Sequence, residues 1–150
     1  MSYTFYIEPT INCIFYKFYG AYDTSVREQS VLDAINHPDF NKEMNILSDT
    51  RNQPIPSDIS FKSITDEVRQ NLKIYDRMLG KCRWATIVAN AQSYAKVHQF
   101  IVTGRLGSHQ VERKPFRNIE KARKWLGIPA DYKIKHHQDT QWSALQRSIM

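Results

Sequence analysis

The chain has 150 residues, of which 41% are hydrophobic and 24% are charged. These values are ordinary for a folded protein and exclude wholesale disorder, and a chain of this length can bury its own hydrophobic core in one domain. The sequence has no long apolar run and no basic segment followed by an apolar one at its start, so it predicts neither a membrane span nor a signal peptide. Cys13 and Cys82 stand alone, so we expect reduced thiols and a cytoplasmic protein.

The net charge of +6 is unevenly distributed along the chain. Residues 1–80 contain 8 Lys and Arg against 11 Asp and Glu, whereas residues 81–150 contain 13 against 4. A basic second half can favour an acidic protein, an anionic lipid surface or nucleic acid. It can equally be a solvated face without a partner.

The chain begins with a hairpin pattern. Residues 3–8 and 13–18 are rich in aromatic and β-branched side chains and are separated by a turn that contains proline, which predicts two antiparallel strands. A helix follows, with cap residues at 23–25, and it should stop before Pro38 because the residue before a proline avoids helical geometry.

A third short strand is predicted at residues 44–47, ended by the polar residues 48–51. Residues 52–57 have the composition of a loop, since two prolines there prevent regular pairing. A long amphipathic helix then covers residues 58–79 and stops at Gly80. Its apolar residues recur at steps of three and four: Phe61, Ile64, Val68, Leu72, Tyr75 and Leu79.

Residues 83–90 (RWATIVAN) form a short apolar run between two helical segments, which is typical of a strand that is buried on both faces of a sheet. A helix is predicted after this run, with Tyr94, Val97, Ile101 and Gly104 on one face. Residues 110–116 form a charged strand, and this polarity indicates a sheet edge. Asn118 is the expected cap of a last helix, which residues 127–129 end.

The resulting order of elements is β-β-α-β-α-β-α-β-α. Alternating strands and helices after a hairpin predict an α/β fold, with a five-stranded, mostly parallel sheet, one antiparallel edge strand and about four helices. We place this domain at residues 1–132. Residues 133–150 are predicted to form a basic C-terminal tail that is partly helical.

Four segments within residues 3–127 carry a family resemblance. They are HPDF at 37–40, ILSDTR at 46–51, RWATIV at 83–88 and FRNIEKARKWLG at 116–127. Together they resemble the SpoIIAA-like branch of the STAS and SEC14-type domains, small α/β modules of bacterial regulatory proteins. The resemblance implies a non-enzymatic role, namely binding a protein partner or, as in the SEC14-like relatives, a small apolar ligand.

One part of the sequence departs from that family. STAS-type anti-sigma-factor antagonists carry a phosphorylatable serine in an Asp-Ser-Ser-Gly type loop after the third strand. The corresponding residues 49–57 read DTRNQPIPS and lack this motif, with Thr50 and Ser57 as weak substitutes. The resemblance therefore implies a module without the phosphoswitch.

The candidate binding residues lie where the predicted strands end, because ligands of open α/β sheets bind at the carboxyl edge. Arg51 suits forked contact with a carboxylate or phosphate, and Asp49 could help to hold a polar ligand or partner. Alternatively, Asp49 caps local backbone amides and Arg51 is solvated. The full set is Tyr22, Asp49, Thr50, Arg51, Asn52, Ser57 and Asn90.

A second candidate surface is basic. Arg117, Lys121 and Lys124 share one face of the last predicted helix, since steps of four and three residues stack. Phe116 and Trp125 are expected to be buried, which leaves few exposed aromatic rings and argues against nucleic acid. An acidic protein or a membrane surface remains as the partner of this patch.

The sequence predicts no catalytic residue, no metal site and no cofactor. His136 and His137 are adjacent and cannot share a helical face, and neither cysteine has a histidine nearby in the sequence. An enzyme would need polar groups with perturbed pKa values at the strand ends.

We therefore predict a non-enzymatic regulatory or interaction module of STAS type, whose partner meets residues 49–57 and the start of the helix beyond them. The expected partner is a protein, with a second copy of the chain as one option. The alternative is a carrier or sensor of a small apolar, lipid-like ligand, held between the sheet and the helix at residues 58–79.

Overall fold

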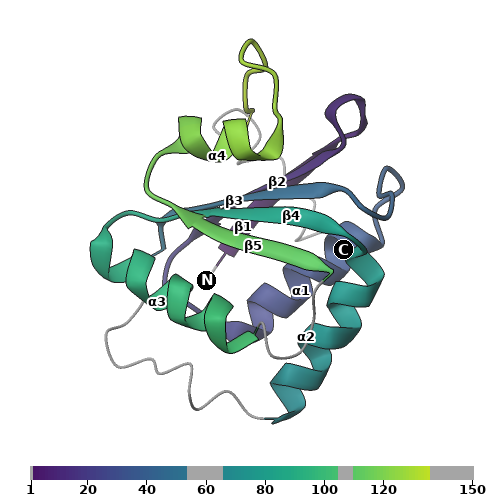
Figure 1. Ribbon diagram of the computed structural model, residues 1–150. Helices are drawn as coiled ribbons and strands as arrows, with labels where there is room; N and C mark the ends of the chain where they lie inside the picture. The colour runs from purple at the N-terminus through teal and green to yellow at the C-terminus, as the bar shows by residue number, and fades with distance from the viewer. Residues whose placement is uncertain (1, 54–65, 105–109, 136–150) are drawn as a thin grey trace.

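The computed structural model describes residues 2–53, 66–104 and 110–135 of the protein (Figure 1). Within these ranges the elements follow the predicted order, with a short 3-10 helix, η1, in the hairpin turn. They are β1 (Ser2–Glu8), η1 (Pro9–Ile11), β2 (Cys13–Tyr19), α1 (Thr24–Ile35), β3 (Asn45–Asn52), α2 (Asp66–Leu79), β4 (Cys82–Ile87), α3 (Ala91–Gly104), β5 (Val111–Phe116) and α4 (Ile119–Leu126).

The five strands form one sheet in the order β1-β2-β3-β4-β5. β1 runs antiparallel to β2, and the other three pairs of neighbours are parallel. This confirms the predicted mostly parallel sheet with one antiparallel edge strand. The charged β5 forms the opposite edge, as its polarity indicated.

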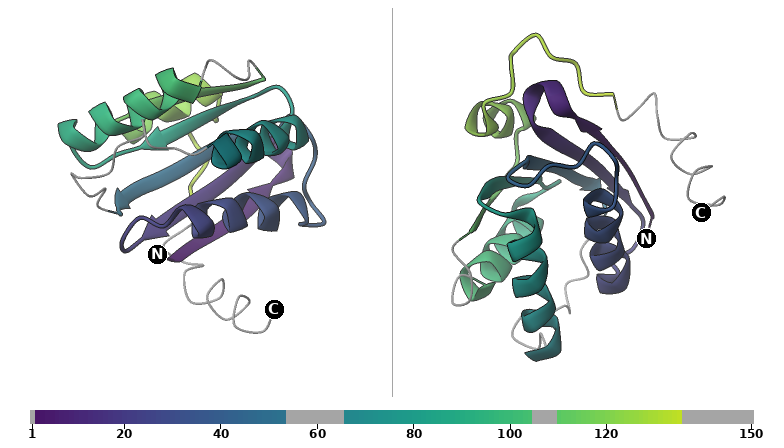
Figure 2. Two further views of the ribbon diagram at one scale, coloured as in Figure 1. Left: turned by 90° about the horizontal axis from the view of Figure 1, so that it is seen from below. Right: turned by 90° about the vertical axis from the view of Figure 1, so that its right-hand side faces the viewer.

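Helices cover both faces of the sheet. α1, α2 and α3 lie below it, on what we call the lower face, and α4 lies above it, on the upper face (Figures 1 and 2). Because successive side chains of a strand point to opposite faces, the single apolar run of β2 contributes side chains to the hydrophobic cores on both faces of the sheet. Ile14, Tyr16 and Phe18 enter the lower core, while Cys13 and Phe15 enter the upper one.

Local side chains fix the helix ends. The carboxylate of Asp23 accepts a hydrogen bond from the Ser25 amide at the start of α1, and the Asn118 side chain accepts from the amides of Glu120 and Lys121 at the start of α4. The chain leaves α2 and α4 through glycines with positive φ, +78° at Gly80 and +73° at Gly127, a conformation that other residues adopt at a cost.

β3 is longer than the sequence pattern predicted. The expected end at residues 48–51 is wrong, because the strand continues to Asn52. Its polar side chains remain in the sheet because they find partners there: the Thr50 hydroxyl donates to the Ile87 carbonyl at 2.7 Å, and the Trp84 indole donates to the Ser48 hydroxyl at 2.9 Å. Buried hydroxyls with partners do not end a strand.

Two predicted boundaries fall outside the described ranges. The start of the long helix predicted for residues 58–79 is one of them, since α2 is described from Asp66. Most of the predicted tail, residues 136–150, is the other. The segment before it folds back on the upper core, where Ile128 is buried and Tyr132 and Ile134 pack against it.

Candidate functional site

Asp49 and Arg51 lie on the same side of β3, near its carboxyl end. The Nε and Nη2 atoms of Arg51 donate to the two carboxylate oxygens of Asp49 at 2.9 and 2.7 Å, and the Arg51 amide donates to Oδ1 at 3.1 Å. Asp49 thus caps a local amide, as one of the two interpretations expected, but Arg51 is not merely solvated. The forked edge of its guanidinium is already hydrogen-bonded to Asp49, while 46% of the Arg51 side chain remains exposed.

This pairing fixes the charge of Asp49. Burial by itself would raise the pKa of the carboxyl group, but the hydrogen bonds and charge of Arg51, together with the charge of Lys17 on β2, lower the pKa below its usual value. Asp49 is therefore ionised at neutral pH. It acts as the fixed partner of Arg51, and a protein or ligand that approaches this edge meets the outer part of the guanidinium.

Three of the other predicted residues have structural contacts. The Thr50 hydroxyl bonds to β4, the side-chain oxygen of Asn90 accepts from the Ser93 amide at 2.8 Å and caps α3, and the Asn52 carbonyl accepts from the Gly20 amide at 3.2 Å. These contacts hold the carboxyl edge together.

Tyr22 and Ser57 complete the predicted set. Tyr22 is partly buried in the short connection between β2 and α1, close enough to the Arg27 guanidinium for the two to interact electrostatically. Ser57 lies outside the described residues. The structure therefore brings Tyr22 to the lower face, whereas Asp49 and Arg51 point to the upper one.

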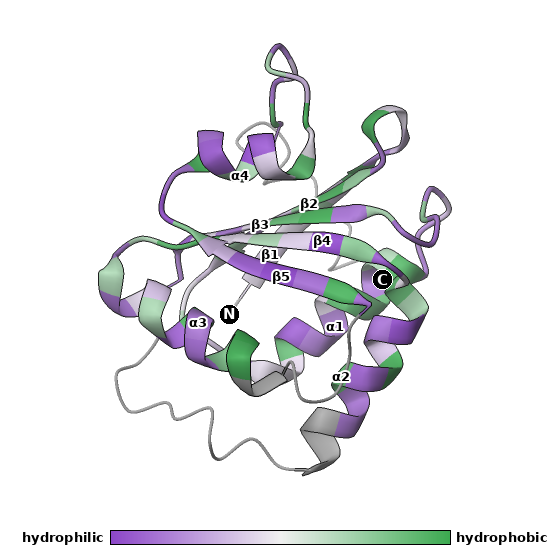
Figure 3. Cartoon of the chain, viewed as in Figure 1, coloured by the Kyte–Doolittle hydropathy of each residue, from purple (hydrophilic) through white to green (hydrophobic). Residues whose placement is uncertain are grey.

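Lys121 and Lys124 lie one turn apart on α4, whereas Arg117 precedes the cap residue Asn118, so the prediction that all three share one helical face is wrong for Arg117. Arg117, Lys121 and Lys124 are all exposed, and none of them forms a salt bridge with another described residue. Hydrophilic residues dominate this helix in Figure 3. We call these three residues the α4 patch.

Two other arginines from the same stretch of sequence are not part of this surface. Arg113 on β5 points to the lower face and pairs with Asp76 of α2. Arg123 turns inward from α4 and donates to the carbonyls of Pro129 and Tyr132, so it ties the following segment to the helix. Sequence spacing alone does not separate these anchored cations from the exposed ones.

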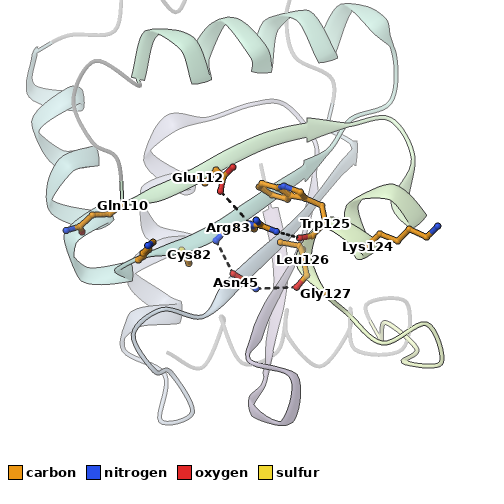
Figure 4. A pocket seen from close by; sticks show the side chains of 10 residues that line it. Asn45, Cys82, Arg83, Gln110, Glu112, Lys124, Trp125, Leu126 and Gly127 are labelled. Atoms are coloured by element: carbon orange, nitrogen blue, oxygen red, sulfur yellow. Dashed lines mark hydrogen bonds and ion pairs between the residues drawn. The ribbon is translucent and has the colours of Figure 1, made fainter.

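The C-terminal end of α4 is fastened to the sheet. Nη1 of Arg83 on β4 donates to the Trp125 carbonyl at 2.8 Å, and its guanidinium lies 5.2 Å from the centre of the Trp125 ring. Nδ2 of Asn45 on β3 donates to the Leu126 carbonyl at 3.3 Å (Figure 4). An open groove of about 530 Å³ adjoins these contacts. The polar groups of Asn45 and Arg83 that line it are already hydrogen-bonded to the end of α4.

The described residues offer little for metal or thiol chemistry. Among them, no group of three His, Cys, Asp or Glu side chains is arranged to hold a metal ion. Cys13 and Cys82 are free and buried, and burial raises the pKa of Cys13 to about 12 and that of Cys82 to about 11. Both thiols are therefore protonated, and weakly nucleophilic, at neutral pH.

Sequence reasoning missed two charged residues on the lower face. Arg27 lies on the buried side of α1, three, four and seven residues before Ser30, Val31 and Ala34. Asp76 occupies the corresponding inner stripe of α2, three residues before Leu79, and it is 3% exposed. The signal was available: a charged residue at a core position of a helical repeat points inward and needs a partner.

Comparison with known proteins identifies a solved structure with a similar fold. Neither a family model nor a curated protein matches the sequence. Among solved structures, the chain is similar to an uncharacterized protein of the DUF3478 family, with a SpoIIAA-like fold, from Shewanella loihica PV-4. The TM-score is 0.52 at 17% sequence identity, over 83% of this chain and 94% of that one.

The chain therefore has a SpoIIAA-like fold, which confirms the resemblance at the level of architecture. Within the described ranges, no helix is long and apolar enough to cross a bilayer. At this level of identity the similarity speaks for the fold, and function has to be argued from the residues.

Proposed function

We propose that this protein is a non-enzymatic interaction module that docks an acidic segment of a partner protein on the α4 patch. The observation that supports this function is a group of three exposed cations that form no salt bridge with any described residue. Arg117 lies just before α4, and Lys121 and Lys124 lie on this helix, which is held at both ends. Such an array is complementary to carboxylates presented by another protein.

The rigidity of α4 favours a specific partner. Asn118 caps its first turn, and the Gly127 and Ile128 amides donate to carbonyls of its last turn. Arg83 and Asn45 bind its final carbonyls from the sheet. Because the helix does not have to be ordered on binding, less free energy is lost to conformational entropy when a partner docks.

The aromatic residues favour a protein over nucleic acid. Phe116 is 8% exposed, and Arg83 already lies over the ring of Trp125. Lys114 is close to both rings, at 5.4 and 6.0 Å from their centres. Since neither ring is open for stacking with a base, the patch offers charge without the aromatic platform that single-stranded nucleic acid uses.

The experiment compares charge-reversal variants after chemical cross-linking in the natural source. Lys121→Glu combined with Lys124→Glu removes the patch, while Lys73→Glu combined with Arg77→Glu on α2 is a matched control of two exposed cations. We expect one acidic protein to be recovered with the wild type and with the control. Its recovery should fall at least about tenfold with the α4 variant, since charged contacts at an interface affect binding strongly.

Two outcomes would contradict the proposal. Equal recovery of the partner by both variants would show that it docks elsewhere. Loss of the complex on nuclease treatment would show that nucleic acid, and not an acidic protein, occupies the patch. Circular dichroism of each variant checks that the fold is retained.

A further inference from the structure

The open groove beside α4 lies at the amino ends of β3, β4 and β5 (Figure 4). It is lined by Asn45 at the start of β3, Arg83 on β4, Glu112 on β5 and the last turn of α4. Its volume of about 530 Å³ is within the range of about 300–1,000 Å³ that is typical of binding sites in proteins. The groove therefore has room for a short stretch of another chain.

The end of α4 does not repel an anion here. The four carbonyls at the end of this helix already accept hydrogen bonds, two from amides of the following turn and two from the side chains of Arg83 and Asn45. Carbonyls at a helix end carry the negative part of the helix dipole. Because each of them has a donor, the charged side chains decide what the groove binds.

Positive charges outnumber negative ones in the lining. Lys81, Arg83 and Lys124 stand against the single carboxylate of Glu112, and neither lysine forms a salt bridge with a described residue. Nη1 of Arg83 holds the end of α4, whereas its Nε lies 3.5 Å from Oε2 of Glu112. The side chains of this last pair are 50% and 59% exposed. Such an exposed pair contributes little stability, so Arg83 can exchange Glu112 for another carboxylate.

The charged residues just outside the groove do not cancel this excess. Glu43 is close enough to the Cys82 thiol to raise its pKa, but Lys42 beside it in the chain supplies an opposite charge. Arg113 and Asp76 also affect the pKa of this thiol, and they pair with each other on the lower face. Each of these two neighbourhoods contains one charge of each sign, so the groove itself remains positive.

The cations are spread along the groove. Figure 4 shows Lys124 at one end and Gln110 at the other, with Arg83 between them. Lys81 belongs to the Gln110 end, because the amide of the next residue, Cys82, donates to the Gln110 carbonyl at 3.1 Å. A small molecule is usually enclosed by its site, whereas this open, elongated arrangement suits an extended segment with several carboxylates.

We propose that the groove receives the acidic segment of the partner where this segment continues beyond the α4 patch, an inference that rests on the docking function. Lys124 belongs to both surfaces, so a segment that crosses it passes from α4 into the groove. Its carboxylates contact Lys81 and Arg83, and the one at Arg83 replaces Glu112. The partly exposed ring of Trp125 contacts the aliphatic parts of the acidic side chains.

The test is an NMR titration of the full-length protein with acetylated octaglutamate at physiological ionic strength. We expect the indole resonance of Trp125 and the amide resonance of Arg83 to shift. Lys81→Glu should weaken binding about fivefold, as for the loss and reversal of one exposed charge contact. Lys73→Glu on α2 changes the net charge equally at another exposed position, and this matched control should bind like the wild type.

The exchange at Arg83 has its own variant. Glu112→Gln removes the competing carboxylate, so it should bind octaglutamate about twofold to fivefold more tightly than the wild type. Unchanged or weaker binding by this variant would overturn the exchange. Equal binding by Lys81→Glu and Lys73→Glu, or unmoved Trp125 and Arg83 resonances at saturation, would overturn the groove as a binding site. Circular dichroism checks that these exposed substitutions leave the fold intact.

Lys121→Glu separates this inference from the docking function, since Lys121 is part of the α4 patch and does not line the groove. Weaker binding by Lys121→Glu together with unchanged binding by Lys81→Glu would exclude the groove and leave docking on the patch standing. Weaker binding by both variants supports one continuous surface. If the wild type does not bind octaglutamate, the groove proposal fails, whereas the cross-linking experiment tests the docking function independently.

Discussion

The cores on the two faces of the sheet differ in how many charged side chains they contain. The upper face is closed by one short helix and by the segment after it, and its core is mainly apolar. The lower face carries three helices (Figure 2). It also takes in the charged residues Asp76, Arg113 and Arg27. The upper face therefore keeps most of its charges on its outer surface, whereas the lower face encloses charges within the fold.

This difference appears in the polar contacts of each face. On the upper face, Arg83 and Arg123 point at carbonyl groups and hold backbone in place. On the lower face, Arg113 is paired side chain to side chain, and Arg27 is not paired with any described residue. Contacts to backbone carbonyls fix the positions of chain segments, whereas a buried charge without a partner lowers the stability of the fold.

The largest expected effect comes from breaking the buried ion pair of the lower face. Asp76→Ala leaves the Arg113 guanidinium without its carboxylate, and we expect the free energy of unfolding to fall by about 3–5 kcal/mol. Urea denaturation measures this. Asp76→Leu combined with Arg113→Met should recover most of the loss, because an apolar pair leaves no charge buried. A loss below about 1 kcal/mol for Asp76→Ala, the range of exposed pairs, would show that the pair is effectively solvated.

The second prediction concerns the segment that closes the upper face. The Tyr132 ring stacks on Phe15 with centroids 5.5 Å apart, and its hydroxyl lies 2.9 Å from that of Tyr6. Tyr132→Ala should lower the free energy of unfolding by about 2 kcal/mol, less than for a fully buried ring because Tyr132 is partly exposed. Tyr132→Phe keeps the stacking and should cost about 1 kcal/mol. Equal losses for both variants would mean that the hydroxyl, and not the ring, secures the segment.

A smaller effect is expected at the start of α4. Asn118→Ala removes the side-chain acceptor of two amides, and caps of this kind contribute about 1 kcal/mol. Thermal unfolding measures the loss, and Asn118→Asp, which retains the acceptor, is the control. If the patch depends on a rigid α4, Asn118→Ala should also weaken partner binding, whereas Asn118→Asp should retain the helix.

The smallest effect is a pH dependence at Asp49. The folded pKa of this carboxyl group is lowered, so its contribution is fully present above the unfolded pKa of about 4 and is lost as the pH falls through the folded value. Unfolding free energies measured at successive pH values should therefore fall more steeply below about pH 4 for the wild type than for Asp49→Asn. Parallel curves would show that the contact with Arg51 does not persist in solution.

The fold was largely predictable because its signals are local. Residues 3–8 and 13–18 have alternating or continuous apolar character, and Asn118 and Gly127 mark both ends of α4. Polar residues caused the clearest error. Ser48 and Thr50 look like the end of a strand, but their partners, Trp84 and Ile87, lie on β4 more than thirty residues later.

The candidate sites were predictable only in part, for the same reason. The structure leaves Arg117, Lys121 and Lys124 exposed, but the spacing predicted that all three share a helical face, whereas Arg117 precedes the cap of α4. The pairing of Arg113 with Asp76 joins β5 to α2 across 37 residues, and no local pattern encodes it. The isolation of Arg27 is harder still, because it depends on which side chains all the neighbouring elements fail to supply.

The order of the strands bears on how the protein is made. Since β1 to β5 lie in the sheet in the same order as in the chain, each new strand joins an edge that already exists when it leaves the ribosome. The hairpin of β1 and β2 closes locally and fast, and each later strand needs one crossover. Segment 128–135, which packs back on that first hairpin, follows all five strands in the chain. Assembly can therefore proceed strand by strand during synthesis from the N-terminus, and the contacts of Tyr132 and Lys135 with Tyr6 form only after all five strands have been made.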